Sequence, residues 1–166
     1  MLEPSMPELS LIQEAVLETP VAQSTLARPD VTVAVRQGAT RCLIHAGYAP
    51  IWEFKLANNR RADICGLSPK GELVIVEVKS GVEDFRTDAK WPEYAPYCDL
   101  FYFAVAPDFP IDLIPATPDQ APGLIVGDAF GAEIVRRAPR FDLAPARRKA
   151  VTLSFARHAA VRALRL

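Results

Sequence analysis

The sequence lacks a long hydrophobic segment, although half of its 166 residues are hydrophobic. Its longest apolar stretches, such as Leu100 to Ala106, are far shorter than the roughly 20 residues that a membrane-spanning helix needs. No basic stretch leads into an apolar segment near the N-terminus, as it does in a secretory signal peptide. We therefore expect a cytoplasmic protein without membrane contact, with enough apolar residues for one core of ordinary size.

Cysteine and histidine are scarce, which restricts the sites that the chain can build. The three cysteines form no Cys-x-x-Cys pair, and only two histidines are present to complete a zinc site with them. Neither histidine has the neighbours of a Ser/His or Cys/His triad. The sequence therefore predicts neither a zinc centre nor a nucleophilic hydrolase, and each cysteine is interpreted as a small buried residue in a reducing compartment.

An excess of charge is also missing, since the net charge is −1 at pH 7. The distribution is uneven: residues 1–30 carry a net charge of −4 and residues 31–135 one of −5. From Arg136 to the end there are nine basic residues against a single acidic residue, Asp142. The C-terminal segment is therefore electropositive, and it forms either a solvated surface or a surface that contacts DNA.

The start of the chain mixes prolines with scattered acidic residues. Residues 1–29 contain four prolines and only a short apolar patch, near Leu9 to Leu17, so we expect a flexible N-terminal arm there. Residues 30–166 are predicted to form a single domain. Its core is expected at 31–106, and a C-terminal hairpin and basic helix at 123–166.

The hydrophobic patterns predict the element order α-β-β-β-α-β for this core. The elements are a helix at 31–46 capped by Asp30, strands at 51–56, 62–67 and 73–78, a helix after Ser80, and a strand at 99–106. The spacing of Ser80 and Glu83 is that of a capping box. Because a helix separates the last two strands, they should run parallel. We expect an α/β fold with a central mixed sheet flanked by helices.

The rest of the chain has simpler signals. Short apolar runs at 124–126 and 133–136 around Gly127 and Gly131 predict a hairpin. A final helix is expected from about Ala144, with Pro145 in its first turn.

Two charged residues stand at the end of the strand at 73–78, which we expect to be buried. Glu77 and Lys79 are separated by one residue, so alternation places both side chains on the same face of the strand. Burying a carboxylate and an amine costs desolvation energy. Stability alone therefore gives little reason to place these two residues in a buried strand. On its own, however, such a pair often marks only where a strand emerges into solvent.

The preceding turn provides a geometric test of this pair. If residues 69–71 form a three-residue loop with Gly71 in the left-handed conformation, Asp63 lies opposite Glu77, and Arg61 lies opposite Lys79. A two-residue loop would instead place Asp63 opposite Val76. Glycine at position 71 favours the first register.

In that register the two carboxylates suit shared binding of a hard divalent cation. Their Cβ atoms would lie roughly 5 Å apart, and Mg²⁺, or Mn²⁺, prefers such oxygen ligands. The carbonyl of Val78 could supply a third oxygen. Lys79 could then position or deprotonate a water that attacks a phosphodiester. The predicted chemistry is hydrolysis of a nucleic acid backbone by Asp63, Glu77 and Lys79.

These residues also resemble a known family. Asp63 followed fourteen residues later by Glu77-Val78-Lys79 is similar to the signature of the PD-(D/E)XK nuclease superfamily, although Ala62 replaces its proline. The runs from Leu56 to Asp63 and from Asp84 to Tyr94 are similar to MmcB-type DNA repair proteins of bacteria. The resemblance implies a restriction-endonuclease-like core, DNA as the substrate and Mg²⁺ as the cofactor.

Other residues near this motif are weaker candidates. Nucleic acid contacts are predicted for residues that are either basic or aromatic: Arg60, Arg61, Lys90, Trp91 and Tyr94. The basic residues could equally be solvated turn charges, and the aromatic residues could belong to the core. A two-residue turn at Asn58-Asn59 would pair Phe54 with Asp63 and turn Glu53 to the opposite face.

The sequence therefore favours a metal-dependent nuclease of DNA repair. The alternative is a module on a nuclease fold that binds DNA, or another repair protein, without cutting. A structural protein with a coincidental motif is the third possibility.

Overall fold

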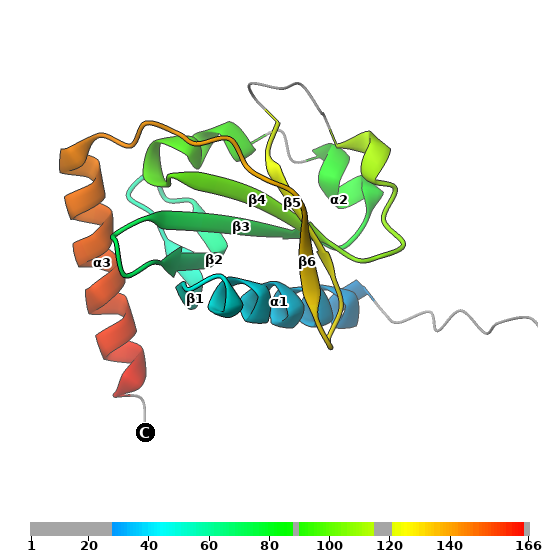
Figure 1. Ribbon diagram of the computed structural model, residues 1–166, viewed down its shortest axis with the longest axis horizontal. Helices are drawn as coiled ribbons and strands as arrows, with labels where there is room; N and C mark the ends of the chain where they lie inside the picture. The colour runs from blue at the N-terminus through cyan, green and yellow to red at the C-terminus, as the bar shows by residue number, and fades with distance from the viewer. Residues whose placement is uncertain (1–27, 88–89, 115–120, 165–166) are drawn as a thin grey trace, which may run out of the picture.

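The computed structural model describes residues 28–87, 90–114 and 121–164, which form a six-stranded mixed sheet with helices on both faces (Figure 1). Its strand order is β1-β2-β3-β4-β5-β6. Helix α1 lies along one face, and α2 lies on the other side of the sheet. The N-terminal arm predicted at 1–29 lies outside the described residues except for its last two.

The elements follow the predicted order. They are α1 (Arg28–His45), β1 (Ala49–Lys55), β2 (Arg61–Leu67), β3 (Leu73–Lys79), α2 (Val82–Thr87), the 3-10 turns η1 (Trp91–Glu93) and η2 (Ala95–Tyr97), β4 (Leu100–Val105), the 3-10 turn η3 (Ile111–Leu113), β5 (Gly123–Gly127), β6 (Ala132–Arg136) and α3 (Pro145–Ala163). The parallel pairing of β3 with β4 is confirmed, as are the β5–β6 hairpin and the final helix. No helix among the described residues is long and apolar enough to cross a membrane.

The turn between β2 and β3 sets the predicted register. The Ser68 N–H donates to the Glu72 carbonyl at 2.9 Å, and Gly71 has a φ of 80°, so the loop is the three-residue type. Ile64 therefore pairs with Val76. This is the register that directs Asp63 toward Glu77.

The turn between β1 and β2 corrects one prediction. It has the same three-residue geometry, because the Leu56 N–H donates to the Arg60 carbonyl at 2.8 Å and Asn59 adopts a φ of 65°. Phe54 consequently pairs with Ala62, not with Asp63. The two-residue turn was wrong, and Glu53 lies level with Asp63 across the strand pair.

Every residue of β3 is buried, because both faces of this strand are covered. Val74, Val76 and Val78 pack in a cluster with Val35 and Leu43 of α1. On the opposite face, the alternate β3 side chains join a second cluster that contains several aromatic rings and reaches α3: Leu73, Ile75, Phe54, Phe101, Phe103 and Phe155. Alternation places Glu77 and Lys79 on this second face.

The helix predicted after Ser80 is observed as α2. It has six residues, and two 3-10 turns lie further along the chain at 91–97. The Ser80 backbone N–H and hydroxyl both donate to Asp84, at 3.0 and 3.2 Å, so Asp84 is the observed partner of Ser80 at this helix start. Pro92 lies inside the first 3-10 turn, where its missing N–H is tolerated.

Candidate active site

Asp63 and Glu77 are joined by hydrogen bonds at the end of the β2–β3 pair. The Asp63 N–H donates to Oε1 of Glu77 at 3.2 Å, and the Val78 N–H donates to Oδ2 of Asp63 at 2.8 Å. The paired register of β2 and β3 is observed as far as Ile64 and Val76. Beyond that point, carboxylate oxygens occupy positions that backbone carbonyls would fill in a longer ladder.

Lys79 completes the cluster on the same face of β3. Glu77 is 7% exposed and Lys79 only 4%, so both lie in a low-dielectric environment. The Lys79 ammonium lies 5.6 Å from the centre of the Phe103 ring. The structure thus places the three predicted catalytic residues at the same end of the β2–β3 pair: Asp63 on β2, and Glu77 and Lys79 on β3.

Asp63 is harder to ionise than an ordinary aspartate. Burial raises its pKa and the nearby Glu53 carboxylate adds to this, while the Val78 N–H and the charges of Lys79 and Arg36 oppose it. The net direction is upward. A carboxylate held in an unfavourable charged state gains when a cation binds beside it.

The residues present can be tested against the predicted Mg²⁺. Among the residues that the structure describes, no group of three or more His, Cys, Asp or Glu side chains could hold a metal ion. Asp63 and Glu77 are two, and the Val78 carbonyl points to the same strand edge as its N–H, which already contacts Asp63. Mg²⁺ commonly binds through one or two carboxylates and keeps several waters. The donor set therefore suits Mg²⁺ better than a metal that needs a complete protein cage.

Glu53 is a further acidic residue near Asp63, and it contacts helix α1. Its carboxylate binds Nη1 of Arg36 at 3.0 Å and Nε of Arg61 at 2.7 Å. Its φ of 54° is unusual for a residue with a side chain. Because these two arginines hold it, Glu53 is better described as a charge partner of the site than as a metal ligand.

The predicted nucleic acid contacts fall into two groups. Arg60 makes a bidentate ion pair with Glu93, at 2.7 and 2.8 Å, whereas Lys90 is exposed. The aromatic residues pack inward: Trp91 and Tyr94 both stack on Phe101, each with ring centroids 5.6 Å apart, and Tyr94 is 5% exposed. The interpretation that Trp91 and Tyr94 belong to the core therefore accounts for where both rings lie.

The family model described as DNA repair protein MmcB-like matches residues 19–166. The chain belongs to this family. The MmcB-like chain is also similar to a solved protein of unknown function from Silicibacter pomeroyi, with 44% sequence identity, a TM-score of 0.74, and coverage of 80% of this chain and 88% of that chain. No curated protein matches it. Membership links this MmcB-like protein to DNA repair.

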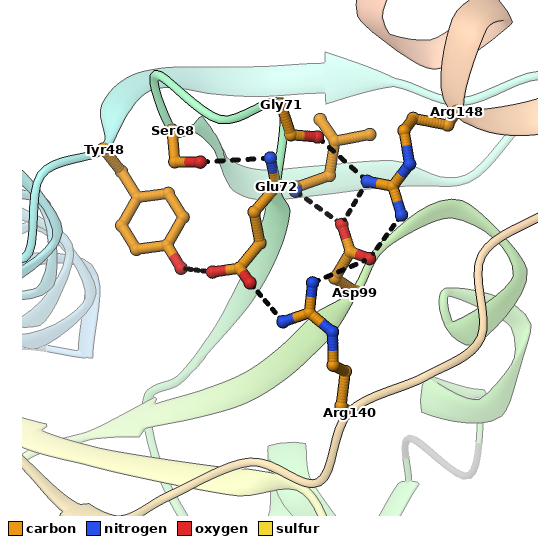
Figure 2. A network of polar contacts seen from close by, with 8 residues as sticks. Tyr48, Ser68, Gly71, Glu72, Asp99, Arg140 and Arg148 are labelled. Carbon is orange, nitrogen blue, oxygen red and sulfur yellow. Dashed lines mark hydrogen bonds and ion pairs between the residues drawn. The ribbon is translucent and has the colours of Figure 1, made fainter. Parts of the chain in front are cut away.

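A second charged cluster of the MmcB-like chain lies at the opposite end of β3 (Figure 2). Asp99, which is 1% exposed, accepts two hydrogen bonds of 2.6 Å from Arg148 and one of 2.8 Å from the Leu73 N–H. Arg140 joins Asp99 to Glu72, and Glu72 also binds the Tyr48 hydroxyl. Sequence reasoning missed this cluster, because its members are far apart in the chain and carry no shared motif.

Proposed function

We propose that this MmcB-like protein is a metal-dependent nuclease of DNA repair that hydrolyses DNA phosphodiester bonds. Asp63 and Glu77 would hold Mg²⁺, with Val78 as a third oxygen donor. Its sheet and helices would represent the restriction-endonuclease-like core of the PD-(D/E)XK superfamily.

The contact between Asp63 and Glu77 carries this proposal. The Glu77 carboxylate accepts the Asp63 N–H at 3.2 Å and the Asp63 carboxylate accepts the Val78 N–H at 2.8 Å, so each carboxylate reaches the backbone of the neighbouring strand. Such bonds fix the direction of the carboxylates before any ligand binds. A buried lysine two residues beyond Glu77 on the same strand then places a cation next to the carboxylate pair.

When bound, the divalent ion supplies Lewis acidity toward a phosphate oxygen. The chain's own residues would do the rest. Lys79 would position the attacking water through its ammonium or, as a neutral amine, would take the proton of that water, and its burial leaves little competing solvent. Arg61, on the strand that carries Asp63, would contact a neighbouring phosphate from its exposed position.

The second candidate is DNA recognition without cleavage. The low exposure of Glu77 and Lys79 favours it, since a water and a phosphate must reach both residues for hydrolysis. Under this alternative the charged cluster would only shape the end of the sheet.

Cleavage assays separate the two candidates. We would incubate the protein with single-stranded, duplex, flap and lesion-bearing DNA in Mg²⁺ or Mn²⁺, and compare Asp63→Asn and Lys79→Ala with the exposed turn variant Lys70→Ala. Loss of at least about 100-fold in rate is expected for the first two variants only. Unchanged DNA affinity, together with no cleavage by any protein including the wild type, would favour the binding module.

A further inference from the structure

Three hollows adjoin one another where the β1–β2 turn meets α3. The first is lined by Lys55, Asn59, Arg60, Arg61 and Tyr94, and the third by Ser154, Arg157, His158, Val161 and Arg162. The middle hollow shares Lys55 with the first and both Ser154 and His158 with the third. Together they are called here the α3 groove, and the first of them is lined by Arg61, two residues from Asp63.

The α3 groove is basic although the whole chain is not. Six of its lining residues are lysine or arginine: Lys55, Arg60, Arg61, Arg147, Arg157 and Arg162. None of the described residues that line the three hollows is acidic. Arg60 and Arg61 have acidic partners outside the lining, Glu93 and Glu53, so the positive potential comes mainly from the middle and far parts of the groove.

The middle hollow differs from its two ends, because its floor is apolar. It has a volume of about 370 Å³, and its walls include Phe54, Leu56, Tyr97 and Val151. The Arg147 guanidinium lies over the Tyr97 ring, 4.5 Å from its centre, and both residues line this hollow. An apolar pocket with cationic groups on both sides suits bases in the middle and phosphates at the ends.

This pattern fits a single strand better than a duplex. A duplex keeps its bases stacked inside and presents its phosphates, so an apolar floor gives it nothing to bind. A single strand exposes base faces that can pack on aromatic and apolar side chains. From Arg147 to Arg162, α3 extends about 22 Å, which is long enough for several nucleotides.

We propose that the α3 groove binds a single strand of DNA that leaves the candidate active site, such as a tail or flap. The inference rests on the proposed function for its choice of DNA as the ligand. Phosphates would contact Arg157 and Arg162, and a base would enter the middle hollow.

A charge-removal experiment tests the far part of the groove. We would compare the double variant Arg157→Gln/Arg162→Gln with Arg137→Gln/Lys149→Gln, which removes the same charge from exposed positions outside the groove. Fluorescence anisotropy at several salt concentrations would measure binding to an oligodeoxythymidine and to a blunt duplex. The groove variant should bind the single strand about tenfold more weakly, with the slope of log affinity against log salt smaller by about 1.4. The control variant and the blunt duplex should change little.

A space-filling experiment tests the middle hollow without changing charge. Ser154→Trp places a large ring where the middle and third hollows meet, whereas Leu153→Trp places it at a neighbouring position that is 60% exposed and outside the lining. Only the first substitution should weaken binding of the single strand, and the salt slope should stay unchanged because no phosphate contact is lost.

Several results would overturn the proposal: equal losses in the groove and control variants, equal losses for duplex and single strand, or no binding of oligodeoxythymidine at all. These outcomes are distinct from failure of the proposed function. If the groove variants lose single-strand binding as expected but no DNA is ever cut, hydrolysis fails and the groove assignment stands. If DNA is cut and the groove variants behave as wild type, only the groove assignment fails.

Discussion

Two aspartates, Asp99 and Asp63, lie beside the two ends of β3 in opposite electrostatic conditions. At the Leu73 end, burial alone would raise the pKa of Asp99, but hydrogen bonds from Arg148 and the Leu73 N–H, with the charges of Arg148 and Arg140, outweigh burial and lower it. At the Lys79 end, burial dominates and the pKa of Asp63 is raised. The first carboxylate is stabilised as an anion by the fold, and the second is not.

The difference agrees with a structural role for Asp99 and with the functional role proposed for Asp63. A carboxylate with a lowered pKa adds stability when it is ionised, so Asp99 helps to hold α3 and the β2–β3 turn on the sheet. A carboxylate with a raised pKa costs stability in its charged form. Proteins commonly accept such a cost at sites that bind or react. The following predictions test this contrast, beginning with the largest effect.

Arg148→Gln should destabilise the protein by about 3 kcal/mol, because it leaves Asp99 buried without its main partner. For a chain of this size, the melting temperature should fall by about 6 to 12 °C. Thermal and urea denaturation would measure the loss against Lys149→Gln, an exposed neighbour on α3. The loss should shrink as pH falls below the ordinary pKa of aspartate, about 4, and through the lowered pKa of Asp99 in the folded protein, because protonated Asp99 no longer needs the arginine. If Arg148→Gln and Lys149→Gln were equally stable, the contact of Arg148 with Asp99 would have no structural role.

Mg²⁺ should stabilise the wild-type protein through the other end of β3. At about ten times its dissociation constant, a bound ion adds roughly 1.4 kcal/mol to the free energy of unfolding. Thermal denaturation with Mg²⁺ and with EDTA would show the shift, which Asp63→Asn should abolish and Arg148→Gln should retain. A shift of the same size in Asp63→Asn would place the ion elsewhere.

Asp63→Asn should leave the free energy of unfolding unchanged or raise it by up to about 1 kcal/mol near neutral pH. The amide oxygen can still accept the Val78 N–H, while the cost of a buried charge disappears. The pKa of Asp63 is raised in the folded protein, so protonated Asp63 contributes stability to the wild type at low pH. This contribution is lost as pH rises through the folded-state pKa. The advantage of the variant should therefore vanish in acid, which urea denaturation across pH would measure. A clear destabilisation at neutral pH would contradict this.

The double variant Arg148→Gln/Asp63→Asn should show the smallest effect, a coupling below about 0.5 kcal/mol. Seven residues of strand separate the two ends by about 20 Å, well beyond the Debye length in physiological salt. A double-mutant cycle from urea denaturation would measure the coupling. A larger value would mean that the two aspartates belong to one network.

Turn chemistry explains which strand register could be predicted. Gly71 identified the β2–β3 loop because a left-handed residue was needed at one position and glycine stood there. Asn59 has the same role in the β1–β2 loop, with a φ of 65°. Asparagine tolerates this conformation but does not demand it, so a two-residue turn was an equally good interpretation, and it displaced the predicted partner of Phe54 by one residue.

Long-range partners explain what could not be predicted. The motif of Asp63, Glu77 and Lys79 was visible because one hairpin brings its members together. Asp99 finds Arg140 and Arg148 more than 40 residues away, through the packing of α3 and of the segment that leads into it. The same packing alters the interpretation of the basic C-terminal segment, since two of its arginines are committed to an internal carboxylate and are not presented to DNA.

The matching turns at both ends of β2 have a consequence for how this family can vary in length. Loops usually accept insertions and deletions, but a residue gained or lost at 69–71 would slide β2 by one position along β3 and reverse the face that each β2 side chain presents to its β3 partner. Asp63 would then point away from Glu77. A length change at 57–59 would instead shift β1 against β2, so length changes compatible with the site should be absent from 69–71 in related chains.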